Sequence, residues 1–85
     1  MTAPLKISVR CFARLREITG TDQLIWDIPS GATIGEFRGL LEARFPDILR
    51  ERLPVLIARN GQYARKEDVI ESADELACFP PVSGG

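Results

Sequence analysis

The sequence contains no histidine and only two cysteines, Cys11 and Cys78. A catalytic thiol usually depends on an activating neighbour, most often a histidine, so thiol catalysis is not expected. A zinc site is equally unsupported, because two distant cysteines do not supply the closely spaced ligands that zinc requires. A glycine-rich phosphate loop and a nucleophile elbow are also missing. Taken alone, the chain has almost no machinery for catalysis, and we expect no bound cofactor or metal.

An excess of one charge and long apolar runs are missing as well. The 85 residues include 11 basic and 12 acidic side chains, whereas a general nucleic-acid binder carries a basic excess. No apolar run approaches the roughly 20 residues that cross a bilayer, and the first residues lack a signal-peptide core. We therefore expect a cytoplasmic protein without a nucleic-acid or membrane partner. A composition that is 45% hydrophobic and 27% charged indicates one small globular domain.

The two cysteines are expected to be small buried thiols in a reducing compartment. They lie far apart in the sequence. The spacing leaves open whether they are neighbours in the fold and whether they are redox-active.

The first regular element is a strand over residues 5–11, where apolar and polar side chains alternate strictly. Alternation places successive side chains on opposite faces of a sheet. One face then carries the core residues Leu5, Ile7, Val9 and Cys11. The opposite face carries Lys6, Ser8, Arg10 and Phe12.

Two helical segments are expected. Residues 13–19 predict a short helical turn that ends at Gly20. Thr33 and Glu36 have the spacing of a capping box and start the main helix, which ends before Pro46. Its apolar residues recur at helical spacing and predict a core face rather than a cofactor groove: Ile34, Phe37, Leu40, Leu41 and Phe45.

The remaining strands are predicted at residues 23–28, 55–59 and 76–79, with a turn at Asn60-Gly61. The segment 62–72 is polar and mixed, with room for a short strand and a turn. This order of elements predicts a mixed sheet packed on one main helix, with the last strand beside the first. That arrangement is the α+β β-grasp, or ubiquitin-like, fold. We expect the domain to span residues 1–79 and a flexible tail to span 80–85.

The sequence ends in Pro80, Pro81, Val82, Ser83, Gly84 and Gly85. Two prolines stop a strand and hold the chain extended, because proline fixes φ and has no N–H to donate. Glycine lets the backbone enter a channel too narrow for a Cβ. Such an ending favours a terminus on whose carboxyl group other proteins act, although frayed termini are also common.

Several segments together resemble the small subunit of molybdopterin synthase, a sulfur carrier. Residues 78–85 resemble its terminal signature, and residues 11–18 resemble its N-terminal motif. Arg59-Asn60-Gly61 and Ala73-Asp74-Glu75-Leu76 stand where the family has a strand turn and an Asp-Glu before the last strand. Cys11 departs from the pattern, since relatives often have an aromatic residue there.

The resemblance implies a chemistry for the terminus. An ATP-dependent activating enzyme adenylates the carboxylate of Gly85, and a sulfur donor converts it to a thiocarboxylate. Gly84 gives a narrow, flexible approach into the large subunit, where the sulfur passes to cyclic pyranopterin monophosphate. The family assembles as a heterotetramer of two small and two large subunits. The large subunit supplies the acid–base groups, so the carrier is expected to be non-catalytic by itself.

A docking face is expected near the tail. Along their strands, Phe12 and Phe79 both occupy positions that alternate with those of the core residues. Their side chains should therefore lie side by side on the outer face if the first and last strands are neighbours. In the family, aromatic residues at these two positions contact the large subunit. Arg16 is a candidate polar partner at the rim. The partner-binding set predicted here is Phe12, Arg16, Phe79, Pro80, Pro81, Val82 and Ser83.

Other functions share this fold. Sulfur carriers for thiamine, cysteine or tRNA thiolation also end in Gly-Gly, and some related proteins are ubiquitin-like modifiers. A plain protein-interaction module without sulfur chemistry is a further alternative. The acidic residues Glu67, Asp68, Glu71, Asp74 and Glu75 are expected to be a solvated face.

Overall fold

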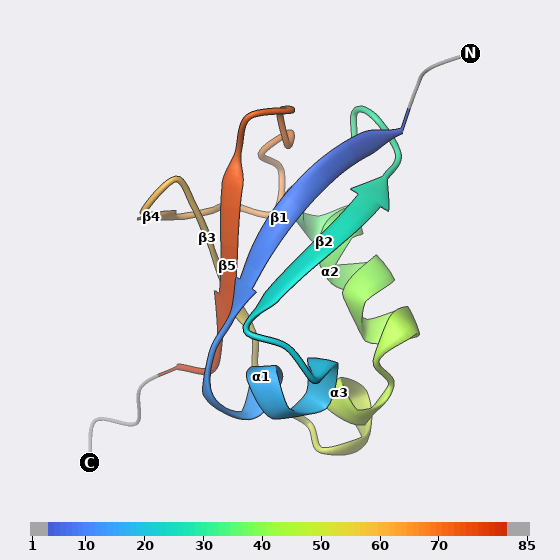
Figure 1. Ribbon diagram of the computed structural model, residues 1–85, viewed down its shortest axis with the longest axis vertical. Helices are drawn as coiled ribbons and strands as arrows, with labels where there is room; N and C mark the ends of the chain where they lie inside the picture. Colours follow the sequence, from blue (N-terminus) through green and yellow to red (C-terminus); the bar gives the residue numbers. More distant parts are fainter. Residues whose placement is uncertain (1–3, 82–85) are drawn as a thin grey trace.

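A computed structural model describes residues 4–81 of the chain. Its elements follow in the order β1 (Leu5–Cys11), α1 (Ala13–Thr19), β2 (Gln23–Ile28), α2 (Ile34–Arg44), α3 (Asp47–Arg50), β3 (Leu56–Arg59), β4 (Gln62–Tyr63) and β5 (Glu75–Phe79) (Figure 1). Every predicted strand and helix is present within two residues of its predicted bounds. The helix α3 was not predicted.

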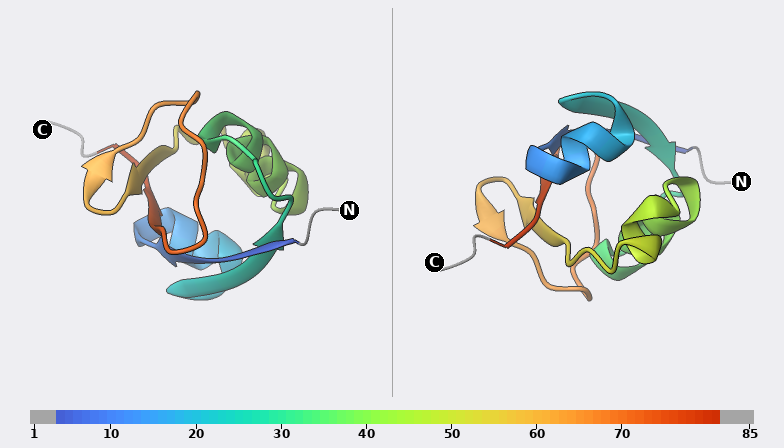
Figure 2. Two further views of the ribbon diagram at one scale, coloured as in Figure 1. Left: turned by 90° about the horizontal axis from the view of Figure 1, so that it is seen from above. Right: turned by 90° about the horizontal axis from the view of Figure 1, so that it is seen from below.

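The strands form one sheet in the order β2-β1-β5-β3-β4. β1 pairs antiparallel with β2 and parallel with β5, so the predicted pairing of first and last strands is confirmed. β3 pairs antiparallel with both β5 and β4. Seen end-on in Figure 2, the sheet curves and α2 lies on its concave side. This is the predicted β-grasp arrangement.

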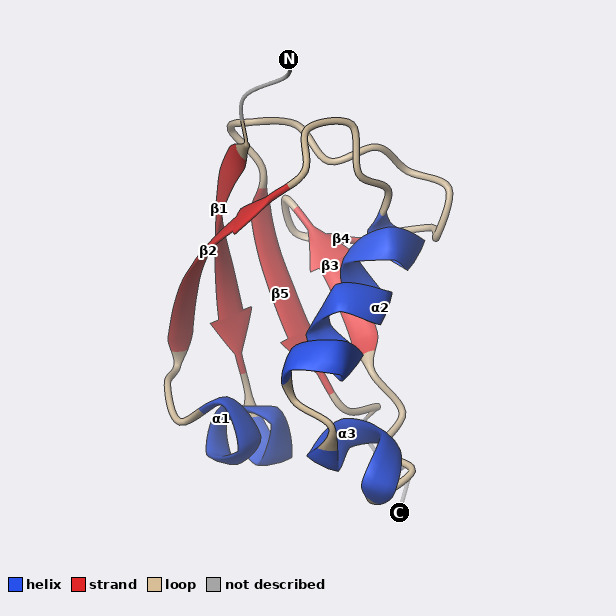
Figure 3. Ribbon diagram, turned by 90° about the vertical axis from the view of Figure 1, so that its right-hand side faces the viewer, coloured by secondary structure: helices blue, strands red, loops and turns tan. Residues whose placement is uncertain are grey.

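The core lies between the sheet and α2 (Figure 3). Ile7, Val9 and Cys11 of β1 point into it, as the alternation predicts, and Leu5 packs at its margin. From α2, Phe37 and Leu41 are fully buried. Leu40 was predicted on the same face but is 36% exposed. At 100° per residue it is turned about 60° from Phe37, which places it at the edge of the contact with the sheet.

Local signals explain the element ends. The backbone N–H of Glu36 donates to the Thr33 hydroxyl, which confirms the predicted start of α2. Gly20 adopts a left-handed φ of 79° at the end of α1. Asn60 and Gly61 both have positive φ, as a tight hairpin turn requires. No helix within residues 4–81 is long and apolar enough to cross a membrane.

Candidate docking surface beside the C-terminal segment

Phe12 and Phe79 lie at the same end of the sheet because β1 and β5 run parallel. Cys11 is the register partner of Cys78, and the N–H of Phe12 donates to the carbonyl of Cys78 at 3.2 Å. Both strands end here, β1 turning into α1 and β5 running out towards the C-terminus (Figure 1). The register therefore brings together two phenylalanines that are 67 positions apart in the chain.

The two rings border an apolar hollow of about 480 Å³, together with Ala13, Pro80 and Pro81. Phe12 is 47% exposed, so the following helix α1 does not cover it. The predicted exposure of Phe12 is thus confirmed, while its contact with a partner stays a prediction. Strand β5 ends at Phe79, immediately before the two prolines, as expected. An exposed apolar hollow of this kind suits an apolar side chain of another protein.

Ala13 accounts for the direction of the chain after Phe12. Its φ is 54°, in the left-handed region that non-glycine residues rarely occupy. The carbonyl of Phe12 then accepts hydrogen bonds from the N–H groups of Leu15 and Arg16, which begin α1. The sharp change of direction at Ala13 leaves the Phe12 ring outside the helix that follows.

Tyr63 extends the aromatic surface and was not anticipated from the sequence. It is 74% exposed on β4, and its ring centroid lies 6.0 Å from that of Phe79 in a tilted pair. Phe12, Tyr63, Phe79, Pro80 and Pro81 together are called the aromatic patch below. A two-residue strand after Asn60-Gly61 gives only a weak signal, and no local pattern reveals that it returns towards Phe79.

A buried carboxylate holds the hairpin that carries Tyr63. Asp74 is 8% exposed and accepts hydrogen bonds from Arg59 Nε (2.7 Å), Asn60 Nδ2 (2.8 Å) and the N–H of Glu71 (2.7 Å). Burial raises the pKa of Asp74, but these three donors outweigh it and hold the pKa below its ordinary value. Asn60 also accepts from the N–H of Glu75 at 2.9 Å. The network ties the β3–β4 turn to the start of β5.

The prediction of a solvated acidic face was therefore wrong for Asp74. Its four acidic companions lie on or near the surface, and Asp68 caps a turn by accepting from the N–H of Arg65. Asp74 differs because the turn at Asn60 folds two donors onto it. A partly buried ion pair with Arg59 replaces solvent there.

Arg16 is exposed on α1, one helical turn after Phe12, and does not line the hollow. Arg14, on the same helix, forms a bidentate pair with Glu51 just beyond α3. Its guanidinium hydrogen bonds hold the pKa of Glu51 below its usual range. The pair anchors α1, and thereby the Phe12 turn, to the rest of the domain. The role of Arg16 at the rim of an interface stays a prediction.

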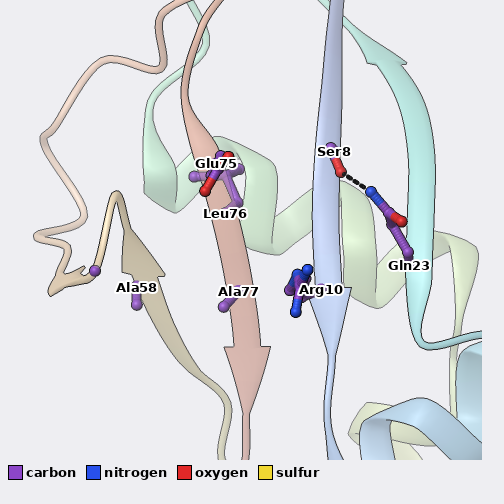
Figure 4. A pocket seen from close by; sticks show the side chains of 8 residues that line it. Ser8, Arg10, Gln23, Ala58, Glu75, Leu76 and Ala77 are labelled. Carbon is purple, nitrogen blue, oxygen red and sulfur yellow. Dashed lines mark hydrogen bonds between the residues drawn. The ribbon is translucent and has the colours of Figure 1, made fainter.

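A shallow polar trough of about 390 Å³ crosses the sheet face that α2 does not cover (Figure 4). Ala58 and Ala77 are register partners, and their small side chains make room for the trough. Arg10 and Glu75 flank it. Gln23 donates to the hydroxyl of Ser8 at 2.7 Å along one side. Arg10 and Ala77 lie two residues before Phe12 and Phe79, so the trough and the aromatic patch lie on the same side of β1 and β5.

Within residues 4–81, no group of three or more histidine, cysteine, aspartate or glutamate side chains could hold a metal ion. The predicted site residues Val82, Ser83, Gly84 and Gly85 lie outside the described residues. What the described part contributes is a surface: an apolar patch that includes Pro80 and Pro81, and a polar trough on the same side of the sheet.

Comparisons with known proteins show the family to which the chain belongs. The ThiS family model matches residues 9–85. The molybdopterin synthase sulfur carrier subunit of Arabidopsis thaliana is 38% identical over 84 residues, covering 99% of this chain and 88% of the plant protein. Small archaeal modifier protein 1 of Haloferax volcanii is 34% identical over 86 residues, covering 89% of this chain and 97% of that protein.

The fold is matched as well. A crystal structure of SAMP1 from Haloferax volcanii aligns with a TM-score of 0.77 and 30% identity, covering 94% of this chain and 99% of that one. Sequence and structure thus agree along almost the whole chain, including the segments that form the aromatic patch. The chain belongs to the ThiS family.

Proposed function

We propose that this protein is the sulfur carrier subunit of a molybdopterin synthase. The observation that carries the proposal is the near-complete match to the plant carrier subunit, which covers 99% of this chain. The aromatic patch supports it, because a carrier must be gripped beside its reactive end.

The proposed chemistry takes place on the carboxylate of Gly85. An activating enzyme transfers AMP from ATP to this carboxylate and releases pyrophosphate. A sulfur donor then displaces AMP, leaving a thiocarboxylate. The carrier itself binds no cofactor in this scheme, and Gly84 allows the terminus to enter a narrow site.

Sulfur delivery requires the large subunit of the synthase. There the thiocarboxylate passes its sulfur to cyclic pyranopterin monophosphate, and two deliveries build the dithiolene of molybdopterin. We propose that the large subunit supplies the acid–base groups, in a heterotetramer of two small and two large subunits. The carrier contributes the sulfur and the docking surface, and both proteins work in the cytoplasm.

The aromatic patch would form the apolar centre of the contact with the large subunit. Phe12, Tyr63 and Phe79 are the large side chains there, and aromatic residues dominate binding energy at such centres. The polar trough, with Arg10 and Glu75, would form part of the hydrated rim. Val82 and Ser83 would then line the path between the patch and the large-subunit site.

The test is a mass measurement followed by a binding measurement. Incubation with the activating enzyme of molybdopterin synthesis, ATP and a sulfide source should add about 16 mass units as –COOH becomes –COSH. A variant lacking Gly85 is the matched control and should remain unmodified while unfolding with the same midpoint. An unchanged mass for the complete chain, together with no binding to the large subunit, would refute the proposal.

The second candidate is a protein modifier. It is favoured by the 34% identity to small archaeal modifier protein 1. In that case Gly85 would form an amide with a lysine of another protein after activation, with loss of AMP. Immunodetection of higher-mass conjugates that require Gly85 would support the modifier. A carrier for thiamine, cysteine or tRNA thiolation would instead gain sulfur but fail to bind the large subunit.

A further inference from the structure

Cys11 and Cys78 are neighbours inside the domain. They are register partners on the parallel strands β1 and β5, and Cys78 Sγ lies 3.7 Å from Cys11 Sγ. Both side chains belong to the core, with 1% and 0% of their surfaces exposed. Neither takes part in the proposed sulfur transfer, which occurs on Gly85. They are the only cysteines in the sequence.

The register brings the pair close to the spacing that a disulfide requires. Neighbouring strands lie about 4.8 Å apart, within the range of Cα separations that disulfides bridge. The two sulfur atoms would have to approach from 3.7 Å to about 2.05 Å, which rotation of two small side chains can supply. We propose that Cys11 and Cys78 are a modification site at which a peroxide forms an intramolecular disulfide between β1 and β5.

The order of steps follows from the hydrogen bond. The Cys78 thiol donates to Cys11 Sγ, which lowers the pKa of Cys11 against the opposing effect of burial. The same contact, together with burial, raises the pKa of Cys78. Cys11 is therefore the thiolate that attacks the peroxide oxygen, giving Cys11–SOH and releasing one water. The Cys78 sulfur then attacks Cys11 Sγ, forming the S–S bond and releasing a second water. Two thiols lose two electrons and two protons to one peroxide.

The pair lies close to the end of the sheet, which is where we expect an oxidant to approach. Cys11 is the last residue of β1, and Cys78 is the last but one of β5. The N–H of Phe12 donates to the carbonyl of Cys78 just beyond the pair, and β5 ends one residue later, at Phe79. Strand ends open more readily than strand centres, so we expect a small peroxide to reach the pair through local opening of this end, without global unfolding.

The bond would link two residues 67 positions apart. Closing so long a loop restricts the unfolded chain and should raise the thermal unfolding midpoint by roughly 15–30 °C relative to the reduced protein. It would also fasten covalently the strand from which the C-terminal segment leaves. Because both sulfurs face the core, the aromatic patch on the opposite face remains exposed.

The experiment treats the full chain, folded and without its activating enzyme, with hydrogen peroxide. We expect a loss of 2 mass units, a cross-linked peptide joining residues 11 and 78 after digestion, and reversal by a phosphine reductant. The matched control is Cys78→Ser, in which oxidation should stop at Cys11 sulfenic acid and be captured by a dimedone probe. If that variant does not fold, alkylation of the wild-type thiols after peroxide treatment answers the same question.

Three results would overturn the proposal. The first is full alkylation of both thiols after peroxide treatment of the folded protein. The second is addition of 32 or 48 mass units at either cysteine in place of the loss of 2. The third is a dimer linked between chains. An unfolding midpoint that stays at the reduced value despite the cross-linked peptide would refute the stabilising role.

Discussion

Replacing Phe12 with alanine should weaken binding to the large subunit without unfolding the domain. The Phe12 side chain is 47% exposed. A phenylalanine can bury on the order of 200 Å², so about 100 Å² is left for a partner to cover. At about 25 cal/mol per Å² this area corresponds to roughly 2.5 kcal/mol, and part of it is lost to ordering costs. We therefore expect a loss of about 2 kcal/mol, or roughly thirty-fold in Kd.

The assay is isothermal titration of the purified large subunit with wild-type and Phe12→Ala carrier. Val69→Ala is the matched control, because Val69 is 45% exposed but lies beside the start of α2, at the opposite end of the sheet. Its affinity should equal that of the wild type. Thermal unfolding of both variants checks that the measured carriers are folded. An unchanged Kd for Phe12→Ala, or an equal loss for Val69→Ala, would remove the aromatic patch from the interface.

Three further outcomes are expected. The low pKa of folded Asp74 means that its carboxylate stabilises the fold above its unfolded pKa of about 4 and loses this effect as pH falls further. Asp74→Asn should therefore cost about 1–3 kcal/mol at pH 7 and progressively less as the pH falls below about 4, measured by urea unfolding; a cost that is independent of pH would contradict this. Ala13→Gly should be neutral or stabilising by up to about 1 kcal/mol, whereas Ala13→Val should be destabilising, because φ at this position is 54°. Removing Gly85 should abolish thiocarboxylate formation and leave the unfolding midpoint unchanged, and a lower midpoint would place the terminus in the fold.

Strict local patterns were sufficient for most of the fold. The alternation in β1 identified both of its faces, because the side-chain period of a strand leaves no second choice. The capping box located the start of α2, because the Thr33 side chain accepts a hydrogen bond from the N–H of Glu36. The helix α3 was not predicted, because a proline after a helix indicates the end of that helix and Pro46 follows α2. In the structure it stands at the N-cap of α3, where a proline is well tolerated since no N–H is needed.

The candidate site was predictable only where the alternation of side chains along a strand decides which face a residue occupies. The exposure of Phe12 follows from its place in the β1 alternation, given that β1 and β5 are neighbours. Tyr63 and Asp74 could not be placed in this way. Tyr63 reaches Phe79 through the pairing of β3 with β5, and Asp74 finds Arg59 and Asn60 across a loop. Such contacts between distant segments have no signature in a single local pattern.

At the β4 edge of the aromatic patch, the interactions that stabilise the fold also position a residue proposed to contact the partner. Tyr63 is largely exposed and belongs to a two-residue strand, so its own packing cannot fix its position. The position is set by the turn at Asn60, which Asp74 holds against β5. Phe12 is different, because it is fixed by β1 and by the turn at Ala13. Losing the Asp74 carboxylate should therefore loosen only the Tyr63 side of the patch, and any binding defect it causes must pass through Tyr63 rather than Phe12.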